Sequence, residues 1–426
     1  MVFSTSKAKN LLAHNNYFFV IIASIAAFVC YTCMYGFRKP FTVATFDSIT
    51  FFGINYKVCL VIAQVLGYML SKLIGIRFIS SLGPNKRAQK ILLCIFIAWF
   101  SLLLFAITPA PYNLIFIFIN GLPLGLLFGL VFSFLEGRNT TEILGAFLVS
   151  SFIFASGFAK TVGKFVLLNL HVSDNWMPFV AGAFYIIPLL ISVYLLQLLP
   201  SPNTADIDSR MIRSAMDDKE RKDFIQLFKW MVIPIVISYT LLTIARDFIE
   251  DFANEFWMEN GFQNCTTIFA SISSIISIVI ILVFATFFLI KNNYKALLIM
   301  NTIIATGLLL VLFSSVLFAF KILSPFHWMF VATTGLYMSY LPFNGLYFDR
   351  FIAVFKIKAN VGFVMYLADT FGYLGTVVIL IFKSFANVQI SWTHFLILLM
   401  LVVSFCCFIF ISFTYYRIKL NVSNYE

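Results

Sequence analysis

The chain has 426 residues, of which 61% are apolar and only 11% are charged. Soluble domains carry about 25% charged residues, so this composition excludes an ordinary water-soluble fold. The formal net charge is +11, but the basic residues lie between apolar runs and form no basic domain, so we do not expect nucleic acid as a partner.

Long apolar runs follow one another along the chain, each close to the ~20 residues that a membrane-spanning helix needs. In the first half they cover residues 17–46, 57–80, 88–108, 112–135, 143–169 and 177–199. In the second half they cover residues 228–250, 264–290, 295–321, 326–349, 358–384 and 391–416. We therefore predict an all-α polytopic membrane protein with twelve transmembrane helices in two six-helix bundles.

The two predicted bundles cover residues 1–199 and 228–426, and the polar stretch 200–227 between them is predicted as a cytoplasmic central loop. This stretch mixes both signs of charge, which is typical of a solvated linker and also compatible with a short surface helix. A faint similarity relates the halves, because "FSFLEGR" ends the run 112–135 and "NGLYFDR" ends the run 326–349. Parallel repeats of this kind build many transporters.

Lys and Arg concentrate in alternate loops, and loops that carry them are retained in the cytoplasm. Placing the N-terminus in the cytoplasm puts nearly all of these cations on that side. We therefore predict a multi-pass protein of the bacterial inner (plasma) membrane with both termini in the cytoplasm.

The seven cysteines lie mostly inside apolar runs, which does not indicate a disulfide framework. Cys30 and Cys33 form a CxxC, but no second ligand pair accompanies them, and within a helix this spacing favours small apolar packing. We expect no metal site and no cofactor.

Ionisable side chains inside the apolar runs are the informative positions. Such a group at the bilayer centre costs about 3 kcal/mol, so those retained there mark a ligand or ion pathway. They are Arg38, Lys39, Lys72, Lys160, Lys164, Arg246, Asp247, Glu250 and Asp369. Nearer the predicted cytoplasmic ends lie Glu136, Arg138, Asp349 and Arg350, which are candidates for gating contacts.

Arg38 and Arg246 occupy similar places in the two halves, late in the first helix of each. Two guanidinium groups that converge on one cavity are suited to a dianion, because each offers a fork of donors to phosphate or carboxylate oxygens. Lys72 would add a third positive charge. Asp247, Glu250 and Asp369 are candidate proton carriers.

Each of these positions has an alternative interpretation. Arg38 and Lys39 could extend to the outer headgroups, and Arg246 could pair with Asp251 and never contact a ligand. Lys160 and Lys164 are four residues apart, so they share one helix face. They form either a water-facing edge or a pair whose repulsion is relieved by an anion.

Three segments carry a resemblance to a known family. "YGFRKPF" contains Tyr35, Arg38 and Lys39, "GYMLSKLIG" contains Lys72, and "LLTIARDFIED" runs through Arg246 to Asp251. These segments resemble motifs of the organophosphate:phosphate antiporters, a branch of the major facilitator superfamily. The sequence departs from the superfamily at Ser80, which stands where an acidic residue is usual after the second helix.

The resemblance implies a secondary transporter that works by alternating access and exchanges a phosphorylated metabolite for phosphate. From the residues and the resemblance together, we expect these substrate-binding residues: Tyr35, Arg38, Lys39, Lys72, Lys160, Lys164 and Arg246. The expected coupling or gating residues are Asp247, Glu250, Asp251, Asp369, Glu136, Arg138, Asp349 and Arg350. Coupling to protons is the alternative to exchange with phosphate.

A second function stays open, which is a membrane sensor of the same fold that binds a phosphorylated ligand without moving it. An enzyme is not expected, because no HExxH, GxSxG or comparable constellation occurs. The expected partners are a small anionic solute and the lipid bilayer, and we expect a monomer.

Overall fold

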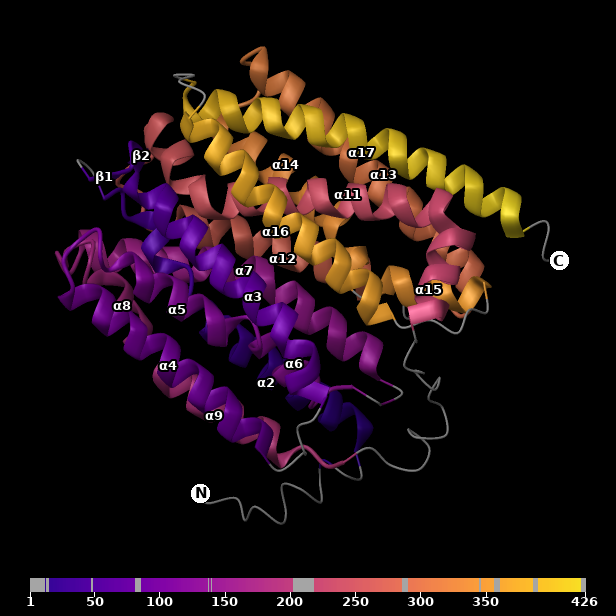
Figure 1. Cartoon of the computed structure of the whole chain (residues 1–426), viewed down its shortest axis with the longest axis horizontal. Coiled ribbons are helices and arrows are strands. Elements are labelled where there is room, and N and C mark those ends of the chain that lie inside the picture. The colour runs from indigo at the N-terminus through magenta and orange to yellow at the C-terminus, as the bar shows by residue number, and fades with distance from the viewer. Residues whose placement is uncertain are drawn as a thin grey trace. The chain divides into compact units, whose positions relative to one another are not determined.

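The computed structural model describes residues 12, 15–46, 49–80, 86–136, 138, 140–201, 218–285, 290–344, 346–355, 361–385 and 390–422. Among these residues the regular elements are helices, apart from two short paired strands, β1 (Thr50–Phe51) and β2 (Ile54–Asn55) (Figure 1). The chain divides into two units. Unit 1 comprises Met1–Arg210 and Asn264–Ile281, and unit 2 comprises Met211–Gln263 and Leu282–Glu426.

Unit 1 is built on paired helices. Its elements are α2 (Asn16–Gly36), the 3-10 helix η1 (Pro40–Val43), α3 (Tyr56–Ser80), α4 (Arg87–Ile107), α5 (Leu114–Leu124), α6 (Leu127–Phe132), α7 (Thr141–Leu168), α8 (Met177–Ala183) and α9 (Ile186–Leu198). Helix α2 packs on α7 and α9, and α5 packs on both α3 and α4. The larger part of α12 (Ile268–Ala285) also belongs to this unit, where the Ala270 amide donates to the Thr161 hydroxyl at 3.0 Å.

Small residues let the helices of unit 1 approach closely. A Cβ placed on Gly121 of α5 would lie 2.5 Å from the Gln64 carbonyl oxygen of α3. A Cβ on Gly67 of α3 would in turn meet the Phe118 carbonyl of α5. Helices without a hydrophobic driving force between them, as in a membrane, depend on such backbone contact for packing.

Unit 2 is arranged around its longest helix. Its elements are α11 (Asp218–Glu259), α13 (Asn293–Ala319), α14 (Pro325–Tyr340), the 3-10 helix η4 (Leu341–Asn344), α15 (Leu346–Phe355), α16 (Val361–Phe385) and α17 (Trp392–Val422). Helix α11 packs on α14, α16 and α17, while α13 packs on α14 and α17. Helix α11 begins at Asp218, inside the predicted central loop 200–227, so this end of the loop is helical. Residues 202–217 of the predicted loop lie outside the described residues.

A carboxylate at the C-terminal end of α11 caps the N-terminus of α17. The Glu259 carboxylate accepts from the Trp392 and Thr393 amides at 2.8 Å each, and from the Thr393 hydroxyl at 2.7 Å. These amides are the unsatisfied donors at the N-terminus of α17, where a negative charge is also stabilised by the helix dipole. Helix α11 departs from helical geometry at Phe252, whose ring stacks on Trp392 with centroids 4.2 Å apart.

Four of the predicted apolar runs are interrupted in the structure. The run 17–46 ends as α2 at Gly36 before η1 starts at Pro40, and the run 112–135 divides into α5 and α6. The run 326–349 divides into α14, η4 and α15, and the run 177–199 becomes α8 and α9, bent by 47°. Pro40, Pro123 and Pro342 lie at three of these breaks and cannot donate the helical hydrogen bond.

Within the described ranges, eight helices are long and apolar enough to cross a membrane, or nine if the bent pair α8 and α9 is one span. The all-α polytopic membrane fold is therefore confirmed, while the count of twelve stays a prediction. Large apolar side chains such as Phe96 on α4 (61% exposed) and Phe382 on α16 (69%) remain on the surface. A surface of this kind suits lipid as its solvent.

We predict that Gly121→Ala destabilises unit 1. The added methyl would push the α3 and α5 backbones apart, and such overpacking costs about 1–3 kcal/mol. The measurement is the thermal unfolding midpoint of the purified protein in detergent. Gly145→Ala on α7 is the matched control, because its Cβ would meet only the Phe132 ring at 3.7 Å. Equal midpoints for the two variants would contradict the close approach of α3 and α5.

Candidate functional site

The turn that follows α2 carries two buried cations. Arg38 and Lys39 lie between Gly36, the last residue of α2, and Pro40, the first of η1, and are 5% and 1% exposed. Both backbone amides donate to the Tyr35 carbonyl, at 3.0 and 2.9 Å, so the chain makes a tight turn here. The predicted extension of these side chains to the outer headgroups does not occur, since both are enclosed by protein.

Two buried amide side chains hold this turn in place. Gln64 of α3 donates from Nε2 to the Arg38 carbonyl and to Asn120 Oδ1, at 3.0 Å each. Asn120 of α5 donates from Nδ2 to the Phe37 carbonyl at 3.1 Å and to the Ala98 carbonyl of α4 at 2.9 Å. Three helices therefore fix the backbone from which the Arg38 side chain extends.

The Arg38 guanidinium lies over an aromatic face. Its Cζ is 4.0 Å from the centroid of the Tyr68 ring and 5.8 Å from that of Tyr35. Lys72 lies one helical turn after Tyr68 on α3, and its Nζ is 5.4 Å from the same Tyr68 centroid. The ring quadrupole attracts a cation, so Tyr68 keeps two positive groups close together at low desolvation cost.

Two further cations are brought to the same turn by α7. Lys160 and Lys164 are 5% and 7% exposed, and Gly163 lies between them along the helix. A Cβ on Gly163 would be 3.1 Å from the Pro40 carbonyl oxygen and 3.2 Å from its Cα, so α7 approaches the backbone next to Lys39 closely. The five buried charged side chains in the described part of unit 1 are all cations: Arg38, Lys39, Lys57, Lys160 and Lys164.

Unit 2 surrounds its arginine with acceptors. Arg246 Nη2 and Nε contact Asp247 Oδ1 at 2.5 and 3.1 Å, and Nη1 donates to the Tyr340 hydroxyl of α14. The guanidinium carbon is 4.6 Å from the Tyr340 centroid. The second carboxylate oxygen of Asp247 accepts from the Thr376 hydroxyl of α16 at 3.0 Å. An acid that pairs with Arg246 is thus its neighbour Asp247, while Asp251, the alternative partner considered from the sequence, is buried further along α11.

A directional chain of hydrogen bonds connects this ion pair to Asp369. The Tyr239 hydroxyl donates to Asp369 Oδ1 at 2.5 Å, and it lies 3.3 Å from the Tyr340 hydroxyl with the two rings stacked. Each hydroxyl has one proton. Because Tyr239 donates to Asp369, Tyr340 donates to Tyr239 and accepts from Arg246. Four side chains from three helices are therefore joined from guanidinium to carboxylate.

The remaining predicted residues are distributed more widely. Glu250 is buried on α11 and accepts from the Tyr337 hydroxyl at 2.8 Å. Arg138 donates to the Pro200 carbonyl and lies over Phe19 at 4.4 Å.

The other gating candidates lie near loops. Arg350 donates to Asn293 Oδ1 at 2.6 Å, which ties α15 to the start of α13. Glu136 is half-buried after α6, and the side chain of Asp349 lies outside the described residues. The contacts of Arg138 and Arg350 join neighbouring elements within one unit, so each holds a loop or a helix end in place.

Sequence reasoning missed the neutral partners of these charges. Gln64, Asn120, Tyr239 and Tyr340 are common residue types in apolar helices and carry no motif, and Tyr68 lies in the segment "GYMLSKLIG" but was not singled out. Their spacing does contain a signal, because Tyr68 lies four residues before Lys72 and Tyr239 lies seven before Arg246, which puts each pair on one helix face.

The sequence profile of the family described as "Family of unknown function (DUF5690)" matches residues 40–419. The chain belongs to this family. The match begins just after Arg38 and Lys39 and includes Lys72, Lys160, Lys164, Arg246 and Asp369. A search of curated proteins found no match.

Solved structures show which fold this DUF5690 member has. A bacterial homolog of the human lysosomal transporter Spinster, inward-facing and unoccupied, aligns with a TM-score of 0.60 at 12% identity over 95% of this chain and 98% of its own. The nucleoside transporter NupG aligns with a TM-score of 0.60 at 18% identity, over 92% and 98%. A D-xylose-proton symporter aligns with a TM-score of 0.60 at 13% identity, over 92% and 96%. The chain therefore shares the fold of these three solved structures.

We predict that Tyr239→Phe destabilises this DUF5690 protein by about 1–3 kcal/mol, because it leaves the buried Asp369 oxygen without its donor and breaks the chain to Tyr340. The measurement is the thermal unfolding midpoint in detergent. The control is Tyr194→Phe on α9, a half-exposed tyrosine that should change stability by less than about 0.5 kcal/mol. A Tyr239→Phe midpoint equal to that of the control would contradict the network.

Proposed function

We propose that the protein is a secondary transporter that moves a small organic anion by alternating access. The observation that supports an anionic substrate is the set of cations in unit 1: Arg38 and Lys39 are buried in the turn after α2, and Lys160 and Lys164 are buried on α7, which packs against that turn at Gly163. Lys72 lies near the Tyr68 ring that Arg38 also covers. Like charges repel when they are held together away from water, and a bound anion lowers that repulsion. The transporter part is supported by the fold, in which the Spinster homolog, NupG and the xylose symporter are all named as transporters.

The substrate class that we propose is a phosphorylated metabolite. The dianionic phosphate matches the planar donor fork of Arg38 and the point charges of the lysines beside it. The resemblance of "YGFRKPF" and "GYMLSKLIG" to organophosphate:phosphate antiporters supports this choice, because Arg38 and Lys72, which those motifs mark, share the Tyr68 ring.

Unit 2 supports a role in coupling. Arg246 is paired with Asp247, so the charge of the guanidinium is largely balanced. We propose that Arg246 responds to substrate binding and does not bind the substrate as a bare cation. Protonation of Asp369 at Oδ1 would turn that oxygen from an acceptor into a donor, so the Tyr239 hydroxyl would have to reorient, and the change would pass through Tyr340 to Arg246. We therefore propose coupling to protons, with Asp369 as the carrier. Asp247, Glu250 and Asp251 are also buried on α11 and are further candidates.

The proposed setting is a bacterial inner membrane with both termini in the cytoplasm, following the distribution of Lys and Arg in the loops. The alternative function is a sensor that binds the same anion without moving it. Binding without uptake would establish that alternative and overturn the transporter. Exchange with phosphate, in place of proton coupling, would appear as uptake that requires phosphate on the other side of the membrane.

We predict that Arg38→Gln and Lys72→Gln each lower uptake of a labelled sugar phosphate into proteoliposomes by about tenfold or more. Loss of a charge-assisted hydrogen bond costs about 1.5–3 kcal/mol, and 1.4 kcal/mol corresponds to tenfold. The control is Lys419→Gln, which removes an exposed cation that lies over the Tyr415 ring at 4.7 Å. If all three variants transport as well as the parent, the unit 1 cations are not the substrate site.

We predict that Asp369→Asn abolishes the stimulation of uptake by an inward proton gradient and retains counterflow with equal pH on both sides. The amide keeps an acceptor for Tyr239 but does not titrate, so substrate still exchanges while proton and substrate movement are uncoupled. Uptake with and without a proton gradient is the measurement, and Asp174→Asn, in a loop of unit 1, is the control. A variant that still responds to the gradient would contradict Asp369 as the carrier.

A further inference from the structure

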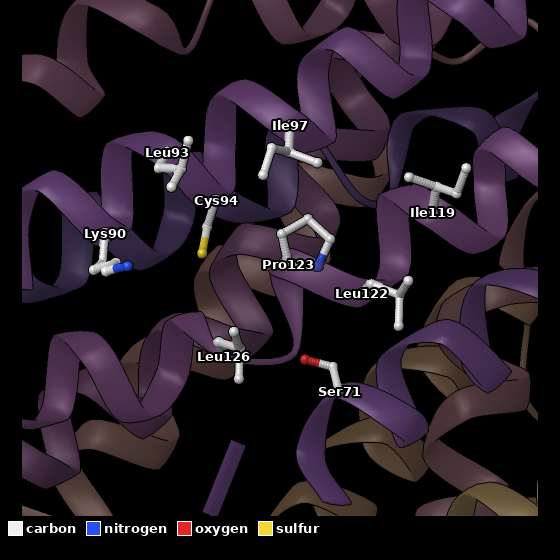
Figure 2. Close-up of a pocket in the computed structure, with 9 residues that line it drawn as sticks. All are labelled: Ser71, Lys90, Leu93, Cys94, Ile97, Ile119, Leu122, Pro123 and Leu126. Carbon is white, nitrogen blue, oxygen red and sulfur yellow. The ribbon is translucent and has the colours of Figure 1, made fainter. Parts of the chain in front are cut away.

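A groove of about 390 Å³ lies in unit 1. It is formed by side chains of α3, α4 and α5, shown as sticks in Figure 2. The lining residues are Ser71, Lys90, Leu93, Cys94, Ile97, Ile119, Leu122, Pro123 and Leu126. The volume is within the range of about 300–1,000 Å³ that small-molecule sites have, and far above the space of one water molecule.

The groove exists because α5 is interrupted beside small side chains. Pro123 lies inside α5 and cannot donate to the carbonyl of Ile119, which is also a lining residue. Opposite the proline, Cys94 of α4 and Ser71 of α3 are too small to fill the space. Gly121 and Gly125 bring another side of α5 against α3, so the helix cannot shift to close the groove.

Most of the wall is apolar and opens at membrane depth. Leu93 and Ile97 are 49% and 39% exposed, and they lie in the middle of α4, one of the helices long and apolar enough to cross a membrane. In a bilayer, an apolar groove that opens sideways at this depth is filled by lipid, because water there would lose its hydrogen bonds.

Two polar groups give the groove a defined end. Lys90 stands at one end of the lining residues, in the first turn of α4, with the exposed Lys86 and the half-buried Arg87 just before it (Figure 2). Ser71 is 4% exposed, and its hydroxyl has no hydrogen-bond partner in the part of the chain that the structure describes. Figure 2 shows this hydroxyl pointing toward Leu126, among the lining residues.

We propose that this groove binds one anionic phospholipid of the surrounding membrane. One acyl chain lies along Leu93, Ile97 and Pro123, and the headgroup phosphate lies at Lys90. The Ser71 hydroxyl donates to an ester carbonyl at the start of the acyl chain. Charge complementarity selects the lipid, because Lys86, Arg87 and Lys90 form a basic end that attracts an anionic headgroup and not a neutral one.

The test is lipid retention by the full-length protein. The protein is purified in detergent and incubated with an equimolar mixture of phosphatidylglycerol and phosphatidylcholine that have identical acyl chains. The bound lipid is then measured by native mass spectrometry. We expect the parent to retain one phosphatidylglycerol in preference to phosphatidylcholine. Lys90→Gln should lower that preference about fivefold, the effect of one basic residue at an anionic surface. Lys229→Gln, which removes an exposed lysine of α11, should leave it unchanged.

A second variant tests the acyl chain independently of charge. Cys94→Phe places a large ring in the groove and should reduce retention of both lipids, whereas Cys406→Phe on the half-buried face of α17 should not. Equal retention of the two lipids by the parent would overturn the proposal. The proposal would also be overturned if Lys90→Gln preferred phosphatidylglycerol as strongly as Lys229→Gln does. The same holds if Cys94→Phe retained as much lipid as the parent.

Discussion

The absence of water inside the bilayer is the constraint on which the rest of this structure depends, because every charge held there must be compensated by protein. In unit 1 the compensating groups include ring faces, with Arg38 and Lys72 over Tyr68. In unit 2 they are the Asp247 carboxylate and the hydroxyl of Tyr340, whose ring stacks on Tyr239. Each arrangement needs at least two helices at a set distance, so the placement of the charges and the packing of the helices are one problem.

The two units solve that problem with different chemistry. The buried charged side chains in the described part of unit 1 are all cations, which suits recognition of an anion. The network of unit 2 ends in a carboxylate joined to a guanidinium through hydroxyls, and its donor direction depends on whether Asp369 is ionised. A fixed positive group in one unit and a titratable chain in the other would divide substrate binding from energy coupling, which is the division that the proposed mechanism requires.

Helix α5 shows how one interrupted helix serves two surfaces. Its glycines meet the α3 backbone so closely that no Cβ fits, and Asn120 on the same helix reaches the turn that carries Arg38. Pro123 leaves the groove beside Cys94, where we infer that a phospholipid binds. The tight contact and the hollow are consequences of the same few residues, because a helix held firmly on one side cannot move to fill a gap elsewhere.

Much about this protein was determined by the sequence alone. The length and composition of the apolar runs determined an all-α membrane fold, and the rarity of ionisable residues in those runs singled out Arg38, Lys160, Arg246 and Asp369. The tertiary structure alone decided which groups meet: Arg246 with Asp247, Arg38 with Tyr68, and Asp369 with Tyr239. It also decided where the helices break. Hydropathy reports only whether a residue tolerates lipid. The partners of a side chain and the breaks in a helix depend on contacts between helices that are distant in sequence, and a one-dimensional pattern does not contain those contacts.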